Sequence, residues 1–157
     1  MDSRIGYEDD FYAWTQEQAR LLREAARERI NTPLDFENLA EEVESMGRSE
    51  TRAVESSLSR ILEHLLKLEF SPAADPRNGW KASVVEHRDR LARDIAASPS
   101  LRGKMDVPDV YRLARKVAAL GLERDGIRLS DLPAECPYSL DQLLDEDWWP
   151  VNRHGLH

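Results

Sequence analysis

The sequence is poor in cysteine, glycine and proline, and each scarcity excludes a class of structure. Cys136 is the only cysteine among 157 residues, so neither an intrachain disulfide nor a cysteine-based metal site can form. The seven glycines and eight prolines cluster at a few places, which is typical of long elements and not of a strand-rich chain. The first residues include no apolar signal segment, and no apolar run approaches the ~20 residues that cross a bilayer. We therefore expect a cytoplasmic protein without a membrane partner.

The net charge is −8, which disfavours non-specific binding to nucleic-acid phosphates. The charges are unevenly distributed. Residues 32–47 hold five acids and no base, and residues 127–157 hold six acids and two bases. Residues 71–126 hold eleven bases and eight acids. Any basic surface is therefore expected within residues 71–126.

Apolar residues recur at helical spacing through most of the chain. The pattern predicts helices over residues 8–30 and 79–97, and a further helix from Asp106 to about residue 121. Thr15 and Gln18 form a capping-box pattern, which predicts a break near Thr15. Ser98 followed by Pro99 predicts a helix N-cap with proline in the first turn. In the helix that begins at Asp106, the residues expected to point inward are Val110, Tyr111, Ala114, Val117 and Ala118.

A single long helix is predicted between Pro33 and Pro72, because no proline interrupts this stretch. Positions 39, 43, 46, 50, 54, 58, 61 and 65 follow one helix face, and Glu50 is the only polar member. Gly47 interrupts the pattern, so we expect a bend there. A glycine inside a helix is less favourable than alanine by about 1 kcal/mol, which a packed bundle tolerates.

The end of the chain predicts a short helix and an aromatic tail. Ser139 and Gln142 form a capping box, and Trp148 and Trp149 follow the predicted helix directly. We expect the two tryptophans to dock on their own chain, with a groove on a partner as the alternative. No strand pattern is present, so the fold class predicted for residues 1–157 is a single-domain, all-α helical bundle.

Five stretches, in order, carry a resemblance to a known family. They are residues 7–15 (YEDDFYAWT), 38–50 (NLAEEVESMGRSE), 63–67 (EHLLK), 79–83 (GWKAS) and 135–147 (ECPYSLDQLLDED). Together they resemble the bacterial "domain of unknown function 29" family over roughly residues 7–150. The resemblance implies a helical fold. It implies no activity, cofactor, ligand or catalytic residue.

Carboxylates on the long helix are the first candidates for chemistry. Glu41 and Glu44 share a helix face with Glu37, and clustered carboxylates are the ligands that Mg²⁺ prefers. With Glu86 and Asp89 as a second pair, the arrangement superficially resembles all-α nucleotide pyrophosphohydrolases. The alternative, which we favour, is a solvated acidic face near a helix N-terminus, where the macrodipole stabilises negative charge.

Two histidines are the second candidates for a metal site. His64 borders the core stripe of the long helix and His87 lies in the stripe of the helix over residues 79–97, and each follows a glutamate. The sequence contains neither Glu-x-x-His nor His-Glu-x-x-His, so di-iron and zinc-peptidase signatures are missing. We favour packed, neutral histidines. Cys136 is interpreted as structural, because Glu135 beside it opposes thiolate formation.

Basic residues form two helical groups that can contact phosphates. The groups are Lys81, Arg88, Arg90 and Arg93, and Arg112, Arg115 and Lys116. No nucleic-acid docking motif accompanies them, and pairing with the acidic segments explains them equally well.

The sequence thus favours an interaction or accessory module over an enzyme, with a protein as the expected partner. Two alternatives stay open. One is a metal-dependent hydrolase of a nucleotide or phosphate ester, acting through Glu41, Glu44 and either Glu86 or His64. The other is a weak nucleic-acid binder. No catalytic residue and no cofactor is assigned, and a homo-oligomer is an open possibility.

Overall fold

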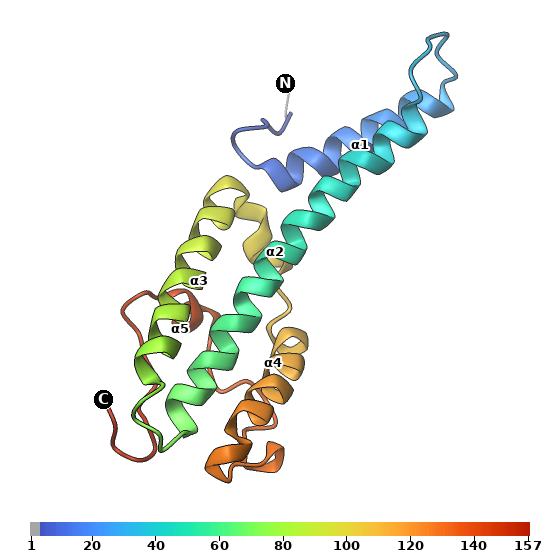
Figure 1. The fold of residues 1–157 in the computed structure, drawn as a ribbon. Coiled ribbons are helices and arrows are strands. Elements are labelled where there is room, and N and C mark those ends of the chain that lie inside the picture. The colour runs from blue at the N-terminus through green and yellow to red at the C-terminus, as the bar shows by residue number, and fades with distance from the viewer. Residues whose placement is uncertain (1–3) are drawn as a thin grey trace. The chain divides into compact units, whose positions relative to one another are not determined.

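The structure, a computed structural model, describes residues 4–157 and is helical in every regular element of that range (Figure 1). The α-helices are α1 (Phe11–Arg27), α2 (Phe36–Phe70), α3 (Arg77–Ala97), α4 (Val107–Leu122) and α5 (Leu140–Leu144). Short 3₁₀ helices lie at η1 (Pro99–Lys104), η2 (Glu123–Asp125) and η3 (Leu129–Asp131). The predicted all-α class is confirmed. None of the described helices combines the length and apolarity needed to cross a membrane.

The chain divides into two compact units. Unit 1 contains residues 4–54 and 93–105 of the described chain, and unit 2 contains residues 55–92 and 106–157. Helices α2 and α3 each contribute residues to both units. The single domain expected over residues 1–157 stays a prediction.

In unit 1, helix α1 begins later and ends earlier than predicted. Its N-cap is Asp10, whose carboxylate accepts a hydrogen bond from the Ala13 backbone N–H at 2.9 Å. The chain leaves the helix after Arg27, and Arg29 adopts the left-handed region at φ 52°. The predicted break at Thr15 was wrong, because Thr15 is buried within the helix and its hydroxyl donates to the Tyr12 carbonyl. That intrahelical bond replaces the capping bond that the sequence pattern suggested.

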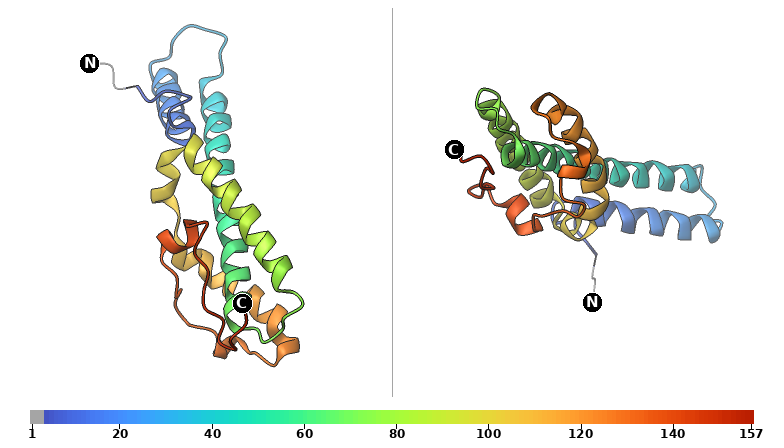
Figure 2. Two further views of the ribbon diagram at one scale, coloured as in Figure 1. Left: turned by 90° about the vertical axis from the view of Figure 1, so that its left-hand side faces the viewer. Right: turned by 90° about the horizontal axis from the view of Figure 1, so that it is seen from below.

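Helix α1 lies along the N-terminal part of α2 (Figure 1, Figure 2), and Gly47 is a point of close approach. A Cβ atom at Gly47 would stand 2.5 Å from Thr15 Oγ1 and 2.9 Å from Gln16 Nε2. The glycine therefore provides the space in which α1 packs. The predicted continuity of the long helix is confirmed, since α2 runs without interruption through Gly47.

The apolar face of α2 behaves differently along its length. In unit 2 it is a core, where Leu58, Ile61 and Leu65 are fully buried. In unit 1 the same predicted face is only partly covered, since Leu39 and Met46 are 40% and 44% exposed. The sequence pattern alone does not distinguish these two halves.

Unit 1 is completed by η1, which follows α3. Ser98 is the N-cap of η1 and Pro99 lies in its first turn, as predicted, but the Ser98 side chain makes no cap bond. Its hydroxyl instead accepts a hydrogen bond from the Tyr12 N–H at 2.9 Å. Asp10 accepts from the backbone N–H and the hydroxyl of Ser100 at 2.7 and 2.9 Å. These bonds tie the start of α1 to η1.

In unit 2, Arg88 of α3 holds the short C-terminal helix. Its buried guanidinium donates to the carbonyls of Gln142, Leu143 and Trp148 at 2.9–3.0 Å. These carbonyls lie at and beyond the end of α5, where a helix leaves its acceptors unpaired. The predicted capping box of Ser139 and Gln142 is confirmed at the other end of α5.

The aromatic tail contacts its own chain. The Trp148 ring packs edge-to-face on Tyr138 with centroids 5.5 Å apart. The Arg88 guanidinium lies over the Trp149 ring, 5.2 Å from its centroid. Docking on the chain itself, the arrangement that the sequence favours, is the one found.

Candidate interaction site on helix α4

The acidic candidates in unit 1 form ion pairs with arginines. Arg23 donates to both carboxylate oxygens of Glu44, at 2.5 and 2.9 Å, and Arg48 donates to Glu41 at 2.7 Å. The hydrogen bond from Arg23 holds the pKa of Glu44 below its usual range. The oxygens that a metal ion would need are therefore already engaged by guanidinium groups.

The candidates in unit 2 divide into an exposed residue and a histidine cluster. The Glu86 side chain is 60% exposed and pairs with Arg90 at 2.8 Å. His64 and His87 come together, since the Ser83 Oγ atom lies 3.3 and 3.4 Å from their Nδ1 atoms. Within residues 4–157, no three His, Cys, Asp or Glu side chains are grouped to hold a metal ion.

The histidines cannot activate the Ser83 hydroxyl, because the ring nitrogens nearest to it are hydrogen-bond donors. The Nδ1 atoms of His64 and His87 lie 2.8 and 2.7 Å from the carbonyls of Arg60 and Ser83. A carbonyl only accepts, so each Nδ1 carries a hydrogen and cannot remove a proton from the hydroxyl. Burial lowers the pKa of His64, which favours the neutral ring that we predicted.

A buried ion pair beside this cluster was not anticipated from the sequence. Glu63 is 5% exposed and accepts hydrogen bonds from Lys67 at 2.9 Å and Arg60 at 3.0 Å. Burial acts to raise the pKa of Glu63, but the hydrogen bond and charge of Lys67 outweigh it and the pKa is lowered. The i, i+4 spacing of Glu63 and Lys67 on α2 was the available signal.

Cys136 lines a hollow of about 480 Å³ beside Tyr111 and Tyr138. Its thiol donates to the Tyr138 carbonyl at 3.4 Å, and burial raises its pKa. A raised pKa leaves little thiolate at neutral pH. The position therefore suits the structural interpretation.

Two of the basic candidates are structural. Arg88 serves as the clamp on α5, and Arg115 donates to the carbonyls of Leu129 and Leu132 at 2.9 and 3.0 Å. The two bonds from Arg115 fix the segment after α4 against that helix. Lys116, the next residue of α4, has no ion-pair partner among residues 4–157.

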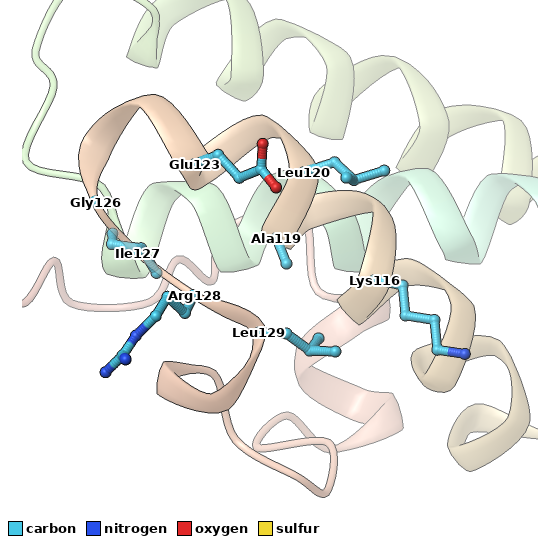
Figure 3. A pocket seen from close by; sticks show the side chains of 8 residues that line it. All are labelled: Lys116, Ala119, Leu120, Glu123, Gly126, Ile127, Arg128 and Leu129. Carbon is cyan, nitrogen blue, oxygen red and sulfur yellow. The ribbon is translucent and has the colours of Figure 1, made fainter.

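The segment fixed by Arg115 forms one wall of a groove along α4. Gly126 adopts the left-handed region at φ 75°, a conformation that glycine reaches without strain. The chain reverses there, and Asp131 accepts from the Arg128 backbone N–H at 2.8 Å to stabilise the following turn. Residues 126–129 consequently run back beside α4 (Figure 3).

The groove has a volume of about 420 Å³ and a mainly apolar lining (Figure 3). Helix α4 and the residue after it contribute Lys116, Ala119, Leu120 and Glu123, and the returning segment contributes Gly126, Ile127, Arg128 and Leu129. Leu120, on its rim, is 69% exposed.

An exposed apolar stripe continues from the groove along α4. Leu113, Val117 and Leu120 are 56%, 38% and 69% exposed and are spaced i, i+4, i+7 on one helix face. The prediction that Val117 points inward was wrong, because the buried face consists of Val110, Tyr111, Ala114, Ala118, Ala119 and Leu122. Helix α4 therefore has two apolar faces, and only one is covered by unit 2. The excess of apolar residues on α4 was the signal in the sequence.

Basic side chains flank this stripe. Lys116 is exposed between Leu113 and Leu120, and the side chains of Arg112 and Arg128 are 67% and 79% exposed. Arg112 and Arg128 have acidic neighbours at 3.6 and 3.5 Å, which moderates their charge. Glu123, which also lines the groove, is exposed as well. The charges around the stripe therefore nearly balance, and Lys116 is the basic residue that lies within the apolar face.

Comparisons with known proteins place the chain in a family. It is similar to an alpha-helical protein of unknown function from Rhodospirillum rubrum, with 32% sequence identity, a TM-score of 0.81 and 92% of each chain covered. None of the curated proteins matches it. Residues 6–149 match the family described as "Domain of unknown function DUF29". Because this match spans most of the chain, the protein belongs to the DUF29 family.

Proposed function

We propose that the protein is a helical interaction module whose α4 groove and stripe bind an amphipathic segment of a protein partner. The observation that carries this proposal is the exposed apolar face formed by Leu113, Val117 and Leu120. A face of this kind, bounded by polar residues, marks binding surfaces on soluble proteins. Its length and spacing suit a helix that presents apolar anchors every three to four residues.

Lys116 supports an acidic residue on the partner segment. Lys116 lies within the apolar face, so an acidic side chain on the partner can pair with it. The apolar lining of the groove is less suited to nucleic acid, because phosphates are bound by polar and cationic groups. The bacterial cytoplasm expected from the sequence provides the setting.

The test compares capture of proteins from the native organism by the wild-type chain and by Leu120→Glu. Burial of a leucine side chain contributes about 1.5–3 kcal/mol. We therefore expect the affinity for specific partners, and with it the amount captured, to fall at least about tenfold. Val85→Glu is the matched control, because Val85 is also an exposed apolar residue on a helix of unit 2, at 56% exposure. Circular dichroism checks that both variants fold.

Equal capture by the wild type and Leu120→Glu would contradict the proposal. Loss of partners in both variants alike would also contradict it, because the effect would then not depend on α4. A low-salt gel shift with duplex DNA and single-stranded RNA tests the nucleic-acid alternative. Retardation that Lys116→Glu removes would favour that alternative over a protein partner.

A further inference from the structure

A second, partly exposed helix face lies in unit 1, on the N-terminal part of α2. Leu39 and Met46 are 40% and 44% exposed, and Glu42 lies between them on the same face, also exposed. Glu42 has no ion-pair partner among residues 4–157. We call Leu39, Glu42 and Met46 the acidic stripe.

The acidic stripe matches the surface on α4 position by position. The spacing of Leu39, Glu42 and Met46 is i, i+3, i+7. Leu113, Lys116 and Leu120 have the same spacing, with the opposite charge in the middle. Residues spaced in this way lie on one helix face, so two such stripes pack apolar side against apolar side around a central acid–base pair.

The central charged residue of each face is not engaged in an ion pair. Glu42 and Lys116 are both exposed and both without an ion-pair partner among the residues that the structure describes. The neighbouring carboxylates of Glu41 and Glu44, in contrast, are already bound by arginines. Glu42 is thus the acid that remains available on this face.

We propose that the acidic stripe of one copy of this chain packs on the α4 surface of a second copy. This rests on the proposed function, because it names the partner segment that the α4 surface receives. Each copy has one surface of each kind, so the contact yields either a closed dimer or ring, or a head-to-tail chain. Two helical stripes of two turns form a small interface, and small interfaces bind weakly.

The test is sedimentation velocity with the full chain over a wide range of concentrations at low salt. The wild type should show mass that rises with concentration. Glu42→Lys and Lys116→Glu should each weaken association by about fivefold, because like charges then face each other. Leu120→Glu should abolish association, and Val85→Glu should leave it unchanged. All four positions are exposed, so the variants are expected to fold.

The decisive sample is an equimolar mixture of Glu42→Lys and Lys116→Glu. In the mixture the two reversed side chains can face each other, so association should return to within about twofold of the wild type. The chain that carries both substitutions should behave in the same way. A mixture no stronger than either variant alone would overturn the pairing of these two residues.

A wild type that stays monomeric at every concentration would overturn self-association. The proposed function would then be decided separately, by whether Leu120→Glu captures fewer proteins than the wild type. Self-association that Leu120→Glu leaves intact would show that another surface mediates it, and would also overturn this proposal.

Discussion

Gly47 and Gly121 lie inside helices, where glycine is unfavourable by about 1 kcal/mol relative to alanine. Each leaves room for a side chain of a neighbouring element. A Cβ at Gly121 would stand 2.6 Å from the Cε atom of Lys67, so Gly121 lets Lys67 extend towards Glu63. A Cβ at Gly47 would meet Thr15. At both positions packing outweighs helix propensity.

We predict that Gly47→Ala lowers the free energy of unfolding. Alanine raises helix propensity by about 1 kcal/mol, but overpacking against the buried Thr15 costs about 1–3 kcal/mol. The expected net loss is up to about 2 kcal/mol, measured by urea denaturation. Gly79→Ala is the matched control, since nothing lies within 4 Å of a Cβ there, and it should be neutral or stabilising. A Gly47→Ala protein more stable than the wild type would contradict the claim that Thr15 leaves no room for a Cβ at position 47.

At the scale of elements, the end of α2 is capped by residues that are distant in sequence. The Asn152 amide donates to the carbonyls of Leu68 and Ser71 at 2.8 and 2.9 Å. The Arg153 backbone N–H donates to the Glu69 carbonyl at 2.9 Å, and His154 Nε2 lies 3.0 Å from the Phe70 carbonyl. The C-terminal strap, residues 152–154, therefore satisfies acceptors that every helix end leaves free.

We predict that Asn152→Ala destabilises the protein by about 1–3 kcal/mol, because the Ser71 carbonyl loses its donor and the Leu68 carbonyl keeps the Arg77 guanidinium alone. Chemical denaturation followed by circular dichroism measures the change. Val151→Ala is the control: Val151 is 87% exposed, and surface substitutions of this kind usually change stability by less than about 0.5 kcal/mol. Equal stability of the two variants would show that the strap does not cap α2.

The elements that sequence reasoning predicted well are those specified by local patterns. The capping box at Ser139 depends on residues three apart, and the core half of α2 depends on helical spacing. The errors concern partners that are remote in sequence. Thr15 is buried because Gly47 leaves room for it. Ser98 is the predicted N-cap, but its hydroxyl bonds to Tyr12 in place of its own helix. A local pattern contains no information about such contacts.

The same division applies to the candidate site. From the sequence, residue type alone identified the candidates for metal binding or catalysis, which were Glu41, Glu44, His64, Glu86 and His87. The sequence did not show that arginines or backbone carbonyls bind most of these side chains. Lys116 was named only as one of several basic residues. Its position on an uncovered face became clear only from the exposure of Leu113, Val117 and Leu120, which depends on where the rest of unit 2 packs.

At the scale of the whole molecule, we predict one cooperative unfolding transition. Helices α2 and α3 each continue from one unit into the other, and helix formation is cooperative along the chain. Differential scanning calorimetry should give equal calorimetric and van't Hoff enthalpies. Two resolved transitions would mean that the units unfold separately, and the single domain predicted from the sequence would be wrong.

The C-terminal strap also has a consequence for biosynthesis. The Asn152 amide and the Leu68 carbonyl that it binds are separated by 84 positions. At about 5–20 residues per second, a ribosome needs roughly 4–17 seconds to travel between them. During that interval the nascent helix has an open end, so unit 2 can reach its final form only after residue 154 has been translated.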